Sequence, residues 1–219
     1  MLSVNNVTVR FKAAVAVNGV SFALDAIEKA CADGAADESW RCADTETLSR
    51  VLAMCDCGSI GLMGHSLGGA TAVTLGRTRD DVAAVIDFDG TMLGEITGVE
   101  NGVDIINEEA YPVPLLSFNN EPHQNEINEC RANGLTYANI TVIDNAKESF
   151  ETCFVGSEHM NFTDLPMFSP FLASLLGTGT ADPVECVTKM NELTLKFFDC
   201  CIKNDGEFTA EDYYEFSER

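Results

Sequence analysis

The chain has 219 residues, enough for one domain with a sizeable hydrophobic core. It has 13 Lys and Arg against 35 Asp and Glu, which leaves a formal charge of −22 at pH 7. This balance argues against nucleic acid as a partner and against binding to a strongly anionic membrane, because phosphates would be repelled. No stretch reaches the roughly 20 apolar residues that a membrane span needs, so we expect no integral membrane segment.

Nine cysteines are many for this length, but their number is odd. Two pairs, Cys55 with Cys57 and Cys200 with Cys201, are too close together for ordinary bridges. We therefore expect reduced thiols in a cytoplasmic protein, and one or two disulfides in a secreted protein are the alternative. No C-x-x-C pair and no histidine cluster at metal-ligand spacing occurs in the sequence, so we expect no metal site.

Apolar patterning predicts strands alternating with helices along a single domain, residues 1–219. The expected elements are, in chain order, helices at 5–30 and 47–54, a strand at 60–63, a helix at 69–75, strands at 82–88 and 113–118, a helix at 122–132, a strand at 139–143, and helices at 162–176 and 183–202. A polar loop is expected at 32–43, and an acidic tail that frays is expected from about 204. This alternation favours a parallel α/β sheet with reactive groups at the carboxyl ends of its strands.

A G-x-S-x-G sequence at residues 64–68 lies between an expected strand and an expected helix. That order is typical of the nucleophile elbow of serine hydrolases. Ser66 would sit on a strained turn with its hydroxyl projecting, while Gly64 and Gly68 would leave room where side chains would clash. The backbone N–H of Leu67 would be one oxyanion donor. The alternative is a glycine-rich turn without chemistry.

A serine nucleophile needs a base that takes its proton. Two histidines follow Ser66 in the sequence. His123 lies at a polar helix start and is interpreted as a surface residue. His159 lies in a loop after the last expected strand, where a catalytic base is expected, so we predict that His159 is the base.

The base in turn needs an acid that orients it. Asp87 and Asp89 flank Phe88 at the end of an expected strand. Asp89 lies beyond the strand and precedes the flexible Gly90, so it is better placed to reach a loop histidine. We therefore favour Asp89 over Asp87 as the acid.

These motifs resemble the platelet-activating factor acetylhydrolases, a group within the dienelactone-hydrolase-like α/β hydrolases. The segments that carry the resemblance are TVRFKA at 8–13, GHSLGGATAV at 64–73, DFDG at 87–90, FNNE at 118–121 and GSEHMNFTD at 156–164. The family has an Asp 23 residues after its serine, which here is Asp89, and a histidine in a GSxHxNFxDF segment, which here is His159.

The resemblance implies an α/β-hydrolase fold, with a mostly parallel sheet flanked by helices. It also implies a serine esterase or lipase-type hydrolase that cleaves carboxylic esters through a triad of Ser66, His159 and Asp89 and an acyl-enzyme. The expected substrates are small-molecule or lipid esters with short or oxidised acyl chains, including phospholipids with an sn-2 acetyl-like group. No metal or organic cofactor is implied.

The family's members begin with several strands and an H-G-type loop that supplies a second oxyanion donor. No such segment precedes the first expected helix, so the N-terminal strands are expected to be missing or reduced. The strand at 60–63 would then have an open edge. One interpretation is a fragment or truncated product. In the other, a second subunit of a homo-oligomer or an unusual N-terminal arrangement covers the edge.

Two other functions stay open. D-x-D-G-T at 87–91 is also the first motif of haloacid-dehalogenase-type phosphatases, in which Asp87 would be the nucleophile and Asp89 an acid/base beside Mg²⁺. That motif should lie near the N-terminus, whereas here a strand-elbow-helix unit precedes it. The non-enzyme alternative is a hydrolase-like scaffold that binds a ligand or partner without turnover. Four side chains could line an acyl pocket, although we favour an ordinary amphipathic core helix, and these are Phe162, Leu165, Met167 and Phe168.

Overall fold

The computed structural model describes residues 45–55, 58–168 and 170–218, together with residues 25, 29, 30 and 32. It divides into two compact units, Met1–Ile60 and Gly61–Arg219. In the first unit, helix α2 (Thr45–Leu52) confirms the helix expected at 47–54, with both ends earlier in the chain. The loop expected at 32–43 and nearly all of the helix expected at 5–30 lie outside the described residues.

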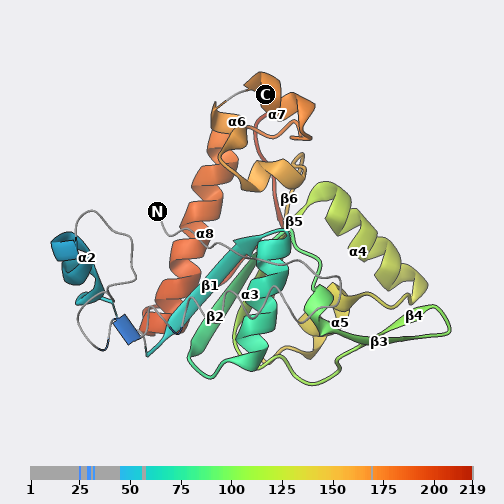
Figure 1. The fold of residues 1–219 in the computed structure, drawn as a ribbon. Helices are drawn as coiled ribbons and strands as arrows, with labels where there is room; N and C mark the ends of the chain where they lie inside the picture. Colours follow the sequence, from blue (N-terminus) through green and yellow to red (C-terminus); the bar gives the residue numbers. More distant parts are fainter. Residues whose placement is uncertain are drawn as a thin grey trace. The chain divides into compact units, whose positions relative to one another are not determined.

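The chain after α2 is organised on a five-stranded sheet with the strand order β1-β2-β5-β6-β7 (Figure 1). The strands are β1 (Ile60–His65), β2 (Val82–Phe88), β5 (Leu115–Asn120), β6 (Ser149–Phe154) and β7 (Tyr213–Tyr214). The pairs β2–β5, β5–β6 and β6–β7 are parallel, which confirms the parallel α/β sheet expected from the sequence. Strand β1 lies at one end of this sheet, and a covering subunit for its edge stays a prediction.

Helices cover both faces of the sheet, and each face has its own apolar core. Helix α8 (Pro183–Lys203) packs on one face, where Ile86, Phe118 and Phe197 belong to one cluster. Helices α3 (Leu67–Thr78) and α5 (Ala138–Asn145) pack on the other face (Figure 1). The central strands are therefore buried on both sides, which explains why their sequences are continuous apolar runs.

The remaining helices include one long helix and several short ones. They are η1 (Leu93–Glu95), α4 (Glu121–Asn133), η2 (His159–Phe162), α6 (Leu165–Phe168) and α7 (Pro170–Leu175). Helices α3, α4 and α8 confirm the helices expected at 69–75, 122–132 and 183–202. The single helix expected at 162–176 was wrong. Pro166 and Pro170 instead lie in the first turns of the short helices α6 and α7, where a missing N–H is tolerated.

The strand expected at 139–143 was also wrong, because these residues lie inside helix α5. Ala138 and Val142 are four residues apart and both face the core beside α3. The side chain of Asn139 accepts the N–H of Met92 at 3.0 Å and donates to the carbonyl of Gly90 at 2.8 Å. Tertiary contacts thus override the strand preference of a short β-branched run. The strand that pairs with β5 in the sheet is instead β6, which has a more polar sequence.

A β-hairpin that the sequence reading missed follows η1. Strands β3 (Ile96–Glu100) and β4 (Val103–Ile106) pair antiparallel and form a separate two-stranded sheet. Asn101 and Gly102 join them, both with positive φ, at 53° and 80°. An Asn-Gly pair is the usual signal for such a turn, so the sequence did carry the information.

The tail from residue 204 does not fray as expected. Phe208 is buried, and β7 pairs in parallel with β6. The N–H of Cys153 donates to Asp212 O at 2.8 Å, and that of Val155 donates to Tyr214 O at 2.9 Å. The acidic residues of the tail obscured an apolar pattern that packs onto the core beside α8.

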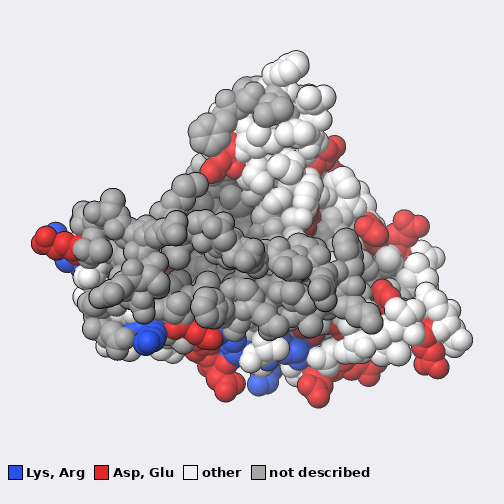
Figure 2. Space-filling model, in the orientation of Figure 1, with Lys and Arg blue, Asp and Glu red and all other residues white. Residues whose placement is uncertain are grey.

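The surface and the thiols are consistent with the composition. Figure 2 shows many more Asp and Glu than Lys and Arg among the described residues of one face. The described cysteines are all free thiols. Of the helices that the structure describes, none has the length and apolar character needed to cross a membrane.

A pair of phenylalanine variants tests the packing of the tail. Phe208→Ala should lower the free energy of unfolding by about 3–5 kcal/mol, the usual cost of emptying a buried phenylalanine site. Phe171→Ala is the matched control, because Phe171 is 83% exposed, and should change stability by less than about 0.5 kcal/mol. Urea unfolding followed by circular dichroism measures both free energies of unfolding. If Phe208→Ala were as stable as Phe171→Ala, the tail would not be part of the core.

Candidate active site

Ser66 occupies the strained turn that the G-x-S-x-G sequence predicts. It joins β1 to α3 with φ 57° and ψ −122°, a conformation that costs a non-glycine residue free energy. Two backbone hydrogen bonds hold the turn: the N–H of Ser66 donates to Phe88 O at 2.8 Å, and the N–H of Ala70 donates to Ser66 O at 3.1 Å. The strain is therefore maintained by the next strand and by the helix that follows.

The close approaches around this turn differ in part from those expected. A Cβ at Gly64 would lie 2.2 Å from the backbone of Gly68, so Gly64 is required by space, as expected. A Cβ at Gly68 would meet nothing within 4 Å, so the expected crowding there was wrong. The second crowded position is Gly69, where a Cβ would lie 1.8 Å from Oδ1 of Asp87.

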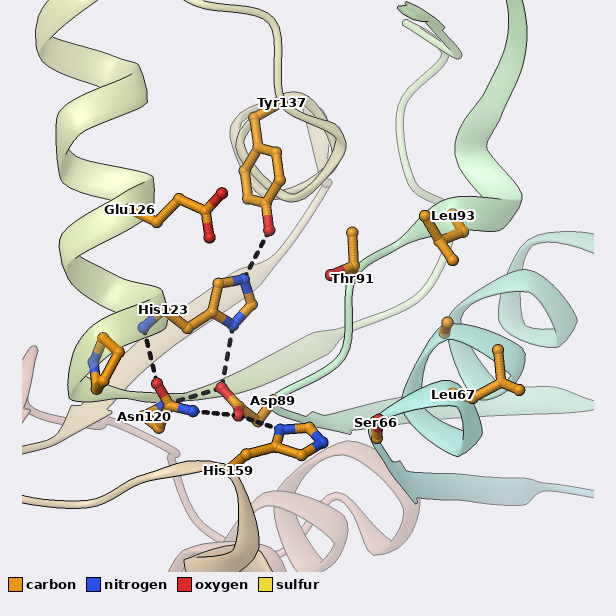
Figure 3. Close-up of a pocket in the computed structure, with 12 residues that line it drawn as sticks. Ser66, Leu67, Asp89, Thr91, Leu93, Asn120, His123, Glu126, Tyr137 and His159 are labelled. Carbon is orange, nitrogen blue, oxygen red and sulfur yellow. Dashed lines mark hydrogen bonds and ion pairs between the residues drawn. The ribbon is translucent and has the colours of Figure 1, made fainter. Parts of the chain in front are cut away.

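Asp89 follows β2 directly, and its carboxylate is buried and fully hydrogen-bonded (Figure 3). Its Oδ1 accepts the backbone N–H of Asn120 at 2.9 Å and is 3.0 Å from Nδ1 of His123. Its Oδ2 accepts Nδ2–H of Asn120 at 2.5 Å and is 2.6 Å from Nδ1 of His159. Burial alone would raise the pKa of Asp89, but the hydrogen bonds from His123, Asn120 and His159 lower it below its usual value. Asp89 therefore stays ionised at neutral pH.

Asp87 has a different environment, two residues earlier. Its side chain is fully buried against α3, and Oδ1 accepts the N–H of Gly90 at 3.0 Å, while Oδ2 has no hydrogen-bond partner. Burial raises the pKa of Asp87 well above its usual value, and the nearby charge of Asp89 raises it further. Burial thus favours the neutral form of the Asp87 carboxyl, which is closed off from the pocket at Ser66.

This placement weighs against the phosphatase interpretation. Asp87 and Asp89 do not converge on one accessible position, and all four hydrogen bonds to Asp89 come from the protein. In the part of the chain that the structure describes, no group of three or more His, Cys, Asp or Glu side chains is arranged to hold a metal ion.

His159 begins η2 and reaches Asp89 with Nδ1, while its side chain is 44% exposed. Its other ring nitrogen lies on the side of Ser66 in Figure 3. Ser66, Asp89 and His159 line one pocket, although no hydrogen bond joins Ser66 to His159 among the described residues. The structure thus brings the three predicted residues to one pocket, with Asp89 and His159 in direct contact.

His65, which lies within the G-x-S-x-G sequence, contacts His159 through a hydrogen bond and through its ring. Its Nε2–H donates to the carbonyl of His159 at 2.9 Å, and the two rings lie 4.4 Å apart between centroids. Burial lowers the pKa of His65, and the neighbouring His159 lowers it further. A neutral His65 can therefore lie against His159 without repelling the charge that a base acquires.

His123 is not the surface residue that the sequence suggested. Its side chain is only 11% exposed and lies between Asp89 and Tyr137, with Nδ1 3.0 Å from Asp89 Oδ1 and Nε2 2.8 Å from the Tyr137 hydroxyl (Figure 3). The sequence did carry a signal for this position of His123. His123 lies in the first turn of α4, directly after β5, and β5 pairs in parallel with β2, so both strands end at the same edge.

The pocket has a volume of about 400 Å³ and a mixed polar and apolar lining (Figure 3). Its lining residues are Ser66, Leu67, Ala70, Asp89, Thr91, Leu93, Asn120, Pro122, His123, Glu126, Tyr137 and His159. Of the suggested acyl-pocket residues, Phe162, Leu165 and Met167 are not among them, and the side chain of Phe168 lies outside what the structure describes. Phe162 is buried against the rings of Phe88 and Phe154, as the core interpretation expects.

The chain matches the family model of platelet-activating factor acetylhydrolase, isoform II, over residues 7–214. Among solved structures, a ferulic acid esterase from Streptomyces cinnamoneus matches with a TM-score of 0.53 at 20% identity. The match covers 87% of this chain and 48% of the esterase, so the chain spans about half the length of that structure. This likeness confirms the α/β-hydrolase fold. No curated protein matches the chain.

The raised pKa of Asp87 has a consequence for stability. A carboxyl whose pKa is raised on folding binds its proton more tightly in the folded chain, so wild-type stability falls as the pH rises above the unfolded pKa of about 3.9. Asp87→Asn removes this cost and supplies a neutral group of the same shape. Its melting temperature should exceed that of wild type by about 3 °C or more at pH 8, and by less at pH 4.

Thermal unfolding followed by circular dichroism at both pH values measures this difference. The exposed Asp80→Asn is the control and should show no such pH-dependent gain. If Asp87→Asn destabilised the fold equally at both pH values, Asp87 would not be a buried neutral acid.

Proposed function

The chain belongs to the platelet-activating factor acetylhydrolase isoform II family, and we propose that it hydrolyses carboxylic esters with Ser66 as nucleophile, His159 as base and Asp89 as acid. One observation carries the proposal. The strained turn at Ser66 opens into the same pocket as a hydrogen-bonded pair of His159 and a buried, ionised Asp89. That arrangement matches the roles of a serine-hydrolase triad.

In the first half of the reaction, His159 takes the proton of Ser66 through Nε2 as the serine oxygen attacks the ester carbonyl. Asp89 keeps the other ring nitrogen protonated and offsets the charge that develops on the imidazole. Its four hydrogen bonds keep the carboxylate ionised and fixed in orientation. The backbone N–H of Leu67, at the start of α3, stabilises the oxyanion. This half ends when the ester C–O bond breaks, the protonated His159 gives its proton to the leaving alcohol, and Ser66 is left acylated.

In the second half, a water molecule gives a proton to His159 and attacks the acyl carbonyl. The acid is released and the Ser66 hydroxyl is restored. Every proton in this cycle passes through Nε2 of His159, which faces Ser66 in the pocket.

The substrates we propose are small-molecule or lipid esters with short or oxidised acyl chains, including phospholipids with an acetyl-like sn-2 group. The pocket supports this choice, because its volume of about 400 Å³ suits a small acyl group and its lining mixes apolar with polar residues. Leu67, Ala70 and Leu93 offer apolar contacts, while Thr91 and Glu126 offer hydrogen bonds to polar substituents.

A fluorophosphonate probe together with p-nitrophenyl acetate hydrolysis tests the triad. The probe should label wild type at Ser66, Ser66→Ala should abolish labelling, and His159→Ala should slow it strongly. Asp89→Asn should reduce kcat by about 10⁴-fold with little change in KM, as in serine-protease triads. The matched control, Asp87→Asn, should lose far less activity.

Several outcomes would contradict the proposal. Labelling that persists in Ser66→Ala would remove the nucleophile assignment, and a larger loss in Asp87→Asn than in Asp89→Asn would move the acid to Asp87. A folded wild-type chain with neither labelling nor esterase activity would favour the scaffold interpretation. Mg²⁺-dependent phosphatase activity that survives Ser66→Ala would favour the aspartate pair.

A further inference from the structure

We propose that His123 is a positioning residue for the hydrolysis, which holds the Asp89 carboxylate through the oxygen that His159 does not use. Tyr137 in turn holds the His123 ring in the orientation that donates to Asp89. This inference rests on the proposed function. It extends the hydrogen-bonded chain beyond the acid, to Tyr137–His123–Asp89–His159.

The position of His123 is fixed at both its backbone and its ring. Its backbone N–H donates to Oδ1 of Asn120 at 2.7 Å, as part of the N-cap of α4. Its Nδ1 lies 3.0 Å from Asp89 Oδ1 and its Nε2 lies 2.8 Å from the Tyr137 hydroxyl. Because both ring nitrogens are engaged by the protein, His123 has no free nitrogen to contact a substrate. It acts on Asp89 instead.

The hydrogen-bond roles follow from the chemistry of the partners. An ionised carboxylate only accepts hydrogen bonds, so Nδ1 of His123 must carry the proton that points at Asp89. In a neutral imidazole the other nitrogen is then an acceptor, and the Tyr137 hydroxyl donates to it. The Asp89 carboxylate therefore selects the tautomer, and the Tyr137 hydroxyl, which can donate or accept, holds the ring by donating to Nε2.

Asp89 needs this second support because of where it lies. Its backbone has φ 56°, outside the regular strand, so β2 alone does not fix the direction of its side chain. Without His123, Oδ1 would keep only the backbone N–H of Asn120, so the orientation of the carboxylate would depend on Asn120 and His159 alone. Small errors of orientation in a catalytic group reduce the rate strongly while leaving substrate affinity unchanged.

Substitutions at His123 and Tyr137 test the proposal with p-nitrophenyl acetate as substrate. His123→Leu removes the donor and should lower kcat by about 10- to 100-fold with KM unchanged. His123→Asn places an amide N–H near the position of Nδ1 and should restore most of that loss. Tyr137→Phe keeps His123 but removes the hydrogen bond to its Nε2, and should lower kcat by less than His123→Leu does. Asn125→Leu, at an exposed position of the same helix, is the matched control.

The rate of fluorophosphonate labelling separates failure of this proposal from failure of the proposed function. If wild type is not labelled at Ser66, the hydrolase function itself fails. If wild type is labelled and His123→Leu keeps kcat within twofold, His123 does not position the acid. An effect on KM alone would make His123 a substrate contact and overturn the proposal. A folded His123→Asn variant that is as slow as His123→Leu would overturn the donor role.

If His123→Leu does not fold, the other two variants decide. A kcat near wild type in His123→Asn together with a lowered kcat in Tyr137→Phe supports the proposal, whereas an unchanged kcat in Tyr137→Phe overturns it.

Discussion

The buried charge of Asp89 is the constraint on which the pocket depends. An ionised carboxylate removed from water is costly unless each oxygen is hydrogen-bonded, and here each oxygen accepts two hydrogen bonds. The donors come from the junction of β5 with α4 and from the start of η2, two segments that are distant in the sequence. Satisfying one side chain therefore fixes both segments at the same edge of the sheet.

Asn120 is the residue that connects this electrostatic requirement to the secondary structure. Its side-chain oxygen caps α4 by accepting the N–H of His123, while its amide donates to Asp89. Its own backbone N–H also donates to Asp89. The start of α4 and two of the four hydrogen bonds to Asp89 thus depend on a single residue, so a change at either is felt at the other.

The sequence alone predicted the parts of the site that depend on local order. Ser66, Asp89 and His159 follow from the order of strand, turn and helix and from the family resemblance, and the structure brings these residues to one pocket. The sheet strands at 82–88 and 113–118 were predicted because strands buried on both faces have continuous apolar sequences.

The parts that depend on long-range contacts were not predicted. A histidine at a polar helix start has the same local sequence whether it faces solvent or a neighbouring strand, so the role of His123 follows only from the pairing of β2 with β5. Likewise, the apolar run at 139–143 suits a strand as well as a helix. Contacts from Asn139 and Val142 decide for the helix.

The chain contains three histidines, and all of them lie within this one cluster: His65 against the carbonyl of His159, and His123 and His159 on Asp89. The imidazole signals in a nuclear magnetic resonance spectrum of this chain therefore all come from the site. Every histidine resonance of the whole chain reports on the same few ångströms, so tautomers and ligand contacts can be followed there without isotope labelling at chosen positions.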